Sequence, residues 1–527
     1  MKEKVKELVK KDGAYLLIGF CLLVVTLLIA TVTYNNSTQD FMLHLPNKSI
    51  YGLISYIGII VLGMAGILVF RNVDRKAVPL EKIYLMLAIP LGILYCIANP
   101  LGRVPDEDYH ARKAMAISYG NIFSHADEKG YAKDYFNANL DPLVNRYINS
   151  YEISVEKMKE PPTEEKVKLE YNTMALYAPI CHAPQAIGML LARIFGADIA
   201  IQCYMARIAN LAIAITLVYQ AIKLIPFKKH IVLFLALLPV TITEFASMAA
   251  DALTIALSLF YVSYIIYLKY DENKMLITKK DIVILTISSI VIALCKIVYI
   301  PLCLLLFVIP KEKFGSLKKK NIITISVFSI SVILNLIWLI YCSRFLVVFN
   351  PGVDSAEQVK YILTHPISYL LIMFRTMNVY NQILIVGLCG EGLGSYCVQA
   401  SVLFIYPCIV MITGLFLLDT EKDKVKIDWK TKLIFLFIFA SIVLLIYTSL
   451  YVQWTPVQSS IIKGVQARYF LPILMLVAIV LNNNKLIIDG KLSYRYILLF
   501  LLFFNLNVLS CTAYTYIYAT VIDYYIK

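Results

Sequence analysis

Apolar runs of 18 or more residues recur along the whole of this sequence, and they restrict the possible folds more than any other feature. Two of them are AYLLIGFCLLVVTLLIATVTY at 14–34 and YILLFLLFFNLNVLSCTAY at 496–514. A helix of about 20 apolar residues crosses the roughly 30 Å hydrocarbon core of a bilayer. In lipid, only helices and closed barrels satisfy their own backbone hydrogen bonds. The sequence therefore predicts an all-α, polytopic integral membrane protein.

The composition supports this fold class. Of 527 residues, 60% are hydrophobic and 16% are charged, which is too apolar for an ordinary soluble domain. The first run is not expected to be a removable signal peptide, because no small-residue cleavage pattern follows it and many more runs do. The 11 cysteines lie mostly inside apolar runs without C-x-x-C spacing, so we interpret them as buried apolar residues.

The net charge of +14 comes largely from lysines and arginines in short connectors between the runs, such as KLIPFKK and PKEKFGSLKKKN. This distribution is the positive-inside signature of cytoplasmic loops. It disfavours the alternative of a basic face for nucleic acid, so no nucleic-acid partner is expected. We expect a multi-pass protein of the plasma membrane, with a cytoplasmic N-terminus and an extracytoplasmic C-terminus. The Lys-, Ile- and Asn-rich composition favours a bacterial source.

Each span moves the chain from one side of the membrane to the other, and the positions of the basic connectors then predict about 13 transmembrane helices. Residues 1–98 are expected to form three of them, and 99–197 a large extracytoplasmic loop with interfacial helices. Further spans are expected in 198–342, including a short hairpin at 281–309. An extracytoplasmic or interfacial segment at 343–397 and the C-terminal spans at 398–527 complete the chain.

The sequence VPDEDYHARK at 104–113 places three acids, a histidine and two bases directly after the third predicted span. Pro105 suits the first position of a helix, and the helix dipole favours Asp106 and Glu107 in its first turn. His110 then lies on the same face as Asp106. A capped surface helix is the structural alternative. It explains the order of charges but not why the helix begins against a membrane.

Ionisable residues from other segments fall on the same predicted outer side, among them Asp251, Lys296 and Arg468. Such groups near membrane depth are costly unless paired or hydrated, so they mark candidate functional sites. Anchoring of helix ends is the alternative for any one of them. No H-E-x-x-H zinc pair, G-x-x-x-x-G-K-[ST] loop or glycine-rich dinucleotide motif occurs in the chain.

The stretch VPDEDYHARKAMAISYG resembles the P-D-E-x-x-H signature of a family of predicted bacterial membrane proteins, domain-of-unknown-function family 2142. The resemblance continues through LLPVTITEFASMAADALTIAL, ALCKIVYIPLCLLLFVIPKEKFG and IKGVQARYFLPIL, and it covers about 90–482. The chain departs from the family pattern at Lys113, where the pattern has Arg, and at Ala467, where it has Gly.

That family is in turn similar to the C-type (GT-C) glycosyltransferases. The stretch CHAPQAIGMLLARIFGADIAIQCYMARIAN is also similar to a region of protein mannosyltransferases and lipid A aminoarabinose transferases. These resemblances imply a GT-C-like fold and transfer of a sugar from a polyprenyl-phosphate-linked donor. The acceptor would be extracytoplasmic: a cell-envelope glycan, a glycolipid or a protein.

Under this hypothesis a carboxylate is the general base for the acceptor hydroxyl, with Asp106 as first choice and Glu107 as second. The leaving phosphate calls for cations or a metal. The candidate substrate- and phosphate-binding residues are His110, Arg112, Lys113, Asp251, Lys296, Gln466, Arg468 and Tyr469. A divalent metal, Mg or Mn, would have Asp106, Asp108 and His110 as ligands; otherwise His110 would hold a carboxylate in place. No other cofactor is expected.

A transporter or flippase of lipid-linked glycans is the main alternative function. Transporters place their sites near the bilayer centre, on broken helices in repeated halves. We see no internal repeat, and the charges collect at one surface, so the sequence favours the enzyme. A non-catalytic scaffold in envelope assembly is a third hypothesis, but a scaffold would not need clustered acids, histidine and bases.

Overall fold

The computed structural model describes residues 2–37, 50–75, 78–136, 159, 167–345, 350–393, 398–420, 425–483, 485–488 and 490–515. Most of the middle of the expected outer loop, 137–158 and 160–166, lies outside the described residues, as do the C-terminal residues 516–527.

Eight described helices are long and apolar enough to cross a membrane, judged by length and composition. They are α1 (Lys2–Ser37), α3 (Leu80–Ala98), α8 (Ile199–Leu224), α11 (Asp251–Tyr270), α13 (Leu317–Cys342), α15 (Pro366–Leu388), α17 (Trp429–Gln453) and α19 (Gly490–Ala513). Shorter apolar segments lie in α2 (Ile50–Arg75), the 3₁₀ helix η3 (Ile297–Val308), α16 (Val402–Leu417), and η5 (Ala467–Ile473) with α18 (Leu474–Val480). The prediction of an all-α polytopic membrane protein is confirmed, whereas the number of 13 spans stays a prediction.

The remaining elements are short. The helices among them are α4 (Glu107–Ser118), η1 (Asn172–Leu176), η2 (Pro179–His182), α7 (Ala183–Ile194), α9 (Lys229–Ala236), α10 (Pro239–Phe245), α12 (Lys279–Cys295), η4 (Lys311–Phe314) and α14 (Ser355–Thr364). The described strands form three two-stranded pairs: β1 (Lys133–Phe136) with β2 (Val167–Glu170), β3 (Glu391–Leu393) with β4 (Val398–Gln399), and β5 (Asp419–Thr420) with β6 (Ile487–Ile488). The first two pairs are antiparallel and the third is parallel.

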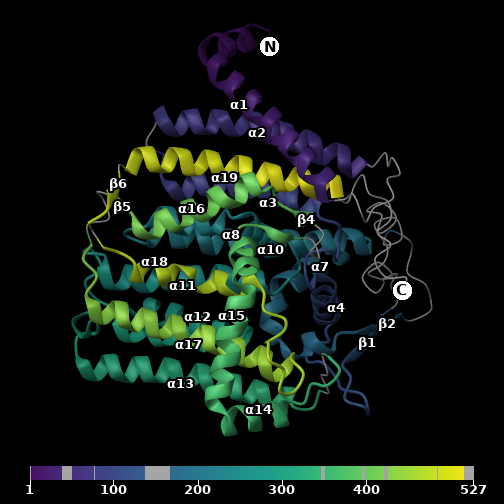
Figure 1. The fold of residues 1–527 in the computed structure, drawn as a ribbon, viewed down its shortest axis with the longest axis vertical. Coiled ribbons are helices and arrows are strands. Elements are labelled where there is room, and N and C mark those ends of the chain that lie inside the picture. Colours follow the sequence, from purple (N-terminus) through teal and green to yellow (C-terminus); the bar gives the residue numbers. More distant parts are fainter. Residues whose placement is uncertain are drawn as a thin grey trace.

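Most of the long helices lie side by side in one stack (Figure 1). Toward one end of these helices (right in Figure 1) lie α4, α7 and the β1–β2 pair, and at the opposite end lie β5 and β6. Helix α15 runs roughly perpendicular to the axes of most of the long helices. The molecule therefore has two distinct ends, and α4 belongs to one of them.

Helix α11 is the central helix of the stack. Within its apolar window 89% of the residues are buried, against 28% for α13 and α17, which present most of their side chains outward. Its neighbours begin at polar caps that satisfy the first backbone N–H groups. Asp198 accepts from Ile201 N (2.8 Å) before α8, and Thr278 and Asp281 form a capping box at the start of α12.

The predicted hairpin corresponds to α12 followed by η3. The backbone of Ile277 donates to Lys313 O (2.8 Å), so the two ends of this segment meet. Lys296 lies between the two helices in an extended conformation, with φ −151° and ψ 121°. The chain therefore reverses at Lys296, and its side chain is carried to the far end of the hairpin from residues 277 and 313.

Candidate functional site

The start of α4 is fixed by a fully buried ion pair between Glu107 and Arg207 of α8. The carboxylate of Glu107 accepts hydrogen bonds from Gly102 N and Met248 N, each at 3.0 Å. Arg207 in turn donates to the carbonyl oxygens of Cys96 (2.7 Å) in the last turn of α3 and of Asn99 (2.6 Å) and Pro100 (2.9 Å) just beyond it. A buried charge must be paired and hydrogen-bonded to be tolerated. This pair therefore ties the turn after α3, helix α8 and the segment before α11 into one unit.

Asp106, directly before α4, has a strained backbone. Its φ of 63° and ψ of 3° lie in the left-handed region, which is uncommon for a residue other than glycine. The side chain makes no cap with α4 and pairs instead with Arg468 at the start of η5. The Asp106 side chain is 43% exposed, whereas that of Arg468 is 6% exposed. Backbone strain of this kind clusters at functional sites.

The Arg468 guanidinium is the centre of a network of carboxylates. Besides Asp106, it faces Glu244 Oε1 of α10 at 3.3 Å and Asp251 Oδ2 at the first residue of α11 at 3.5 Å. It also donates to Pro105 O (3.0 Å). Three segments that are distant in sequence, 105–106, 244–251 and the one that carries Arg468, therefore meet at one guanidinium.

Lys296 extends the network from the hairpin. Its ammonium pairs with Asp251 and lies 4.7 Å from the centre of the Tyr469 ring and 5.9 Å from that of Tyr177. Tyr299 donates to Tyr469 O (2.7 Å), which attaches η3 to η5. Aromatic faces attract a cation and hold it in place. Lys296 is thus positioned by one carboxylate and two rings.

The network has more acids than bases. Its three carboxyls, Asp106, Glu244 and Asp251, meet two cations, Arg468 and Lys296. Glu244 is 2% exposed, and its Oε2 has no hydrogen-bond partner among the described residues. An unpartnered buried carboxylate oxygen is costly, whereas a protonated one is much less so. The geometry therefore identifies Glu244 as the acid that would carry a proton.

A pair of histidines lies beside the network. His110 Nδ1 of α4 meets His182 Nε2 of η2 at 2.8 Å, and Tyr177 packs edge-on against both rings. Burial lowers the pKa of His110 to about 4, although Asp251 and Asp106 oppose this shift. Burial likewise lowers the pKa of His182, and the neighbouring His110 adds to the effect. Both rings are therefore neutral at pH 7.

For Asp106, unlike the two histidines, the effect of neighbouring groups on the pKa exceeds that of burial. Partial burial favours its neutral form, but the adjacent Arg468 outweighs burial and holds the pKa of Asp106 below its usual range. The carboxylate is therefore ionised at neutral pH, and it is also exposed enough to meet a second molecule.

The structure brings together five of the residues predicted from sequence: Asp106, Asp251, Lys296, Arg468 and Tyr469. His110 lies next to them. Gln466 is half-buried and precedes η5, and its backbone oxygen accepts from Tyr469 N.

Three other predicted residues lie outside the network. Glu107 belongs to the buried pair with Arg207. Arg112 faces Asp108 at 3.5 Å and donates to Glu170 O of β2, while Lys113 bonds to Ser124. These contacts hold the outer loop against α4.

Sequence reasoning missed Glu244, Arg207 and His182 as members of this region. The sequence contained a signal for Glu244 and Arg207. Each is an ionisable residue within an apolar segment, and such residues are functional candidates by default. His182 is a further histidine on the predicted outer side, but nothing in its spacing pairs it with His110.

The three expected metal ligands have other partners in the described structure, and the divalent-metal site stays a prediction. Asp106 is paired with Arg468, Asp108 with Arg112, and His110 Nδ1 with His182. Within the described part of the chain, no group of three or more His, Cys, Asp or Glu residues has a metal-binding arrangement.

The fold and the site together define a polytopic helical membrane protein with a buried polar network at one end of its helices. The chain belongs to a family described as predicted membrane protein (DUF2142), whose model matches residues 90–477. This span includes every member of the network. No curated protein and no solved structure matches the chain.

Proposed function

We propose that this protein is a membrane glycosyltransferase that moves a sugar from a polyprenyl-phosphate-linked donor to an extracytoplasmic acceptor. The observation that carries the proposal is the geometry of Asp106. An exposed, ionised carboxylate is held in a strained backbone conformation against a buried guanidinium, at the end of a membrane helix bundle. Strain and a buried charge network both cost stability, so a role in reactivity accounts for their presence better than a role in folding.

In the proposed reaction, Asp106 accepts the proton of the acceptor hydroxyl. The hydroxyl oxygen forms a bond to the anomeric carbon while the bond from that carbon to the phosphate oxygen breaks. The electron pair of the broken bond leaves with the phosphate. A low pKa makes Asp106 a weak base but a persistent negative charge, which stabilises the positive charge that develops at the anomeric carbon.

The leaving phosphate needs a positive partner. Lys296 is the more accessible of the two cations, since its side chain is 16% exposed and that of Arg468 is 6% exposed. In the proposal, Lys296 turns from Asp251 toward the phosphate, and Arg468 keeps Asp106 and Asp251 in place. With Glu244 protonated, the cluster is electrically neutral before the donor binds.

The position of the network along α11 supports an outward-facing site. The network lies at Asp251, the first residue of α11, and a helix of 20 residues is about 30 Å long. At the other end, Lys269 meets Asp428 (3.2 Å) and Lys313 donates to Asp271 O (3.1 Å), so lysine-bearing connectors gather there. By the positive-inside rule those connectors are cytoplasmic and the network is extracytoplasmic. We extend the same proposal to a bacterial plasma membrane.

The proposal is tested by Asp106→Asn in cells of the source organism from which the native gene has been removed. Asn has nearly the same shape and tolerates the left-handed conformation, so the variant should fold. We expect the sugar composition of the envelope to match that of the deletion strain. The matched control is Asp108→Asn, an acid two residues away that is paired with Arg112 outside the network. It should restore the native composition.

The same strains separate the enzyme from a flippase. Under the proposal, lipid-linked sugar accumulates on the outer leaflet when Asp106 is replaced. Accumulation on the inner leaflet would instead indicate translocation. Native envelope composition with Asp106→Asn would contradict a catalytic role for this residue.

A further inference from the structure

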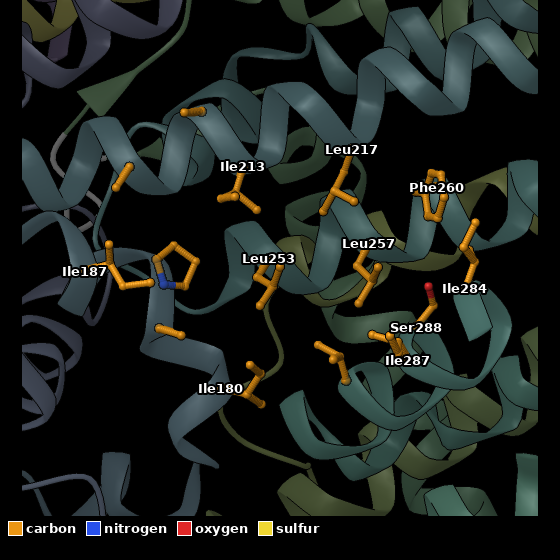
Figure 2. A pocket seen from close by; sticks show the side chains of 15 residues that line it. Ile180, Ile187, Ile213, Leu217, Leu253, Leu257, Phe260, Ile284, Ile287 and Ser288 are labelled. Carbon is orange, nitrogen blue, oxygen red and sulfur yellow. The ribbon is translucent and has the colours of Figure 1, made fainter. Parts of the chain in front are cut away.

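An apolar groove runs along the side of the helix bundle beside the network. It is lined by side chains of η2, α7, α8, α11 and α12 and has a volume of about 710 Å³ (Figure 2). Ser288 is the one lining residue with a polar side chain. Two of the helices that line the groove, α8 and α11, are long and apolar enough to cross a membrane.

The groove is elongated parallel to the helix axes. Leu253, Leu257 and Phe260 follow one face of α11 at spacings of four and three residues, and Ile284 and Val291 lie on α12 opposite them. Seven residues of helix extend about 10 Å. Figure 2 shows the labelled side chains on either side of one continuous space, with Ile180 and Ile187 toward one end and Phe260 and Ile284 at the other.

Helices α11 and α12 are antiparallel, which fixes the end that meets the network. Tyr264 donates to Asp281 at the start of α12 (2.6 Å), and Lys296 after its end pairs with Asp251. Leu253 is thus two residues from Asp251, and Val291 is five residues from Lys296. One end of the groove therefore lies at the same end of α11 and α12 as the network.

A third element closes the same end. Ile180 lines the groove and lies two residues before His182, whose ring contacts His110. Helices η2, α11 and α12 therefore line the groove and also carry, or lie directly beside, residues of the network and of the histidine pair. A ligand with a charged head and a hydrocarbon tail matches a polar network followed by an apolar groove.

We propose that the groove binds the single hydrocarbon chain of a polyprenyl phosphate, with the phosphate at Lys296. This inference rests on the proposed function, which supplies a phosphate and one chain, and it adds where that chain lies. A lining without charges or amides excludes a polar occupant, because nothing in it would replace lost hydrogen bonds to water. The volume falls within the range of about 300–1,000 Å³ for ligand sites.

Alanines form part of the groove wall and provide a way to fill it. Ala212 of α8 lines the groove and is exposed, so a larger side chain there projects into the groove rather than into the core. Ile208, one helical turn earlier, is 43% exposed and does not line the groove. Ala212→Trp should block the chain, and Ile208→Trp is the matched control.

The test uses the purified full-length protein in lipid nanodiscs and a polyprenyl phosphate with a photoreactive diazirine in its chain. Cross-linked peptides are mapped by mass spectrometry. We expect labels on α8, α11 and α12 at groove residues, at least tenfold fewer labels in Ala212→Trp, and native labelling in Ile208→Trp. Unlabelled polyprenyl phosphate should compete, and a two-chain anionic phospholipid should not.

Two results would overturn the inference. Equal competition by the phospholipid would make the groove a general lipid contact. Labels spread over all outward-facing helices, unchanged by Ala212→Trp, would remove the groove as a binding site.

The Asp106→Asn variant separates this inference from the proposed function. It should keep the groove labels while losing transfer. If Asp106→Asn keeps the groove labels and also the native envelope sugars, the groove binds lipid but Asp106 is not catalytic. Loss of transfer without any groove-specific labels would reject the groove alone.

Discussion

Asp106 and Arg468 form an ion pair across 362 residues of sequence. One partner precedes a short helix at the end of the bundle, and the other begins a 3₁₀ helix near the C-terminal third of the chain. The pair joins the N-terminal and C-terminal parts of the family-matched region, 90–477. The pairing of these two residues therefore depends on the complete fold.

Substitutions at Asp106 distinguish the effect of its left-handed backbone on stability from the effect of its carboxylate on sugar transfer. Asp106→Gly should stabilise the protein relative to Asp106→Ala by about 1 kcal/mol, because glycine adopts φ 63° without a steric cost. Both variants should lose sugar transfer, because both lack the carboxylate. Thermal unfolding of the purified variants in detergent gives the order of stability. Equal stability of the Gly and Ala variants would show that the backbone is not strained.

The pair of Glu107 with Arg207 is predicted to act in folding rather than in chemistry. Removing one partner of a buried pair leaves an uncompensated charge and costs about 3–5 kcal/mol. Glu107→Gln should therefore lower the amount of folded protein sharply, and Glu107→Gln combined with Arg207→Met should recover part of the loss. The fraction of monodisperse protein in size-exclusion chromatography measures both. Native yield and stability for Glu107→Gln alone would refute this role.

The buried histidines predict a loss of stability in mild acid. The pKa of His110 is lowered to about 4, below the value of about 6.5 in an unfolded chain. Between these values the unfolded state binds more protons, so stability decreases as the pH falls from about 6.5 to about 4, by about 3 kcal/mol in total. His182 contributes in the same direction.

Thermal unfolding measured between pH 4 and pH 8 tests this pH dependence. His110→Gln should flatten the curve in part. His365→Gln, a change at an exposed histidine whose Nδ1 meets Thr364, is the control and should leave the curve as it is. An unchanged slope for His110→Gln would mean that its protonation is not coupled to folding.

Close packing of α15 against η5 predicts a compensating pair. A Cβ added at Gly387 would lie 2.8 Å from the Cβ of Ala467, next to Arg468. Gly387→Ala should therefore displace η5 and reduce both stability and transfer. Adding Ala467→Gly should restore them, since it removes the opposing methyl group. Two independent, additive losses in the double variant would indicate that the contact does not control the position of Arg468.

The sequence predicted the fold class well because hydropathy and charge distribution are local properties. Spans such as α13 and α17 are continuous apolar helices between charged connectors, and such a pattern is legible without the fold. The number of spans is harder to predict from the sequence, because η3 and the η5–α18 segment are short and partly 3₁₀. Their stability comes from neighbours rather than from their own hydrogen-bonding pattern.

The candidate site was only partly predictable for the same reason. Spacing along α4 indicated that Asp106 and His110 share a face, but it gave no means of telling which acid faces the interior. The structure directs Glu107 to Arg207 and Asp106 to Arg468, and this choice depends on where α8 and η5 pack. Contacts between segments more than 100 residues apart set these roles, and one sequence does not encode them visibly.

The most direct test of the account is transfer of a labelled sugar in isolated membranes that carry the full-length chain. The sugar is first loaded onto polyprenyl phosphate, and its passage into the lipid-free envelope fraction is then followed. We predict transfer by the native protein and a loss of at least 100-fold for Asp106→Asn, with folded protein at native levels. Transfer by Asp106→Asn at the native rate would contradict the assignment of this network as a glycosyltransferase site.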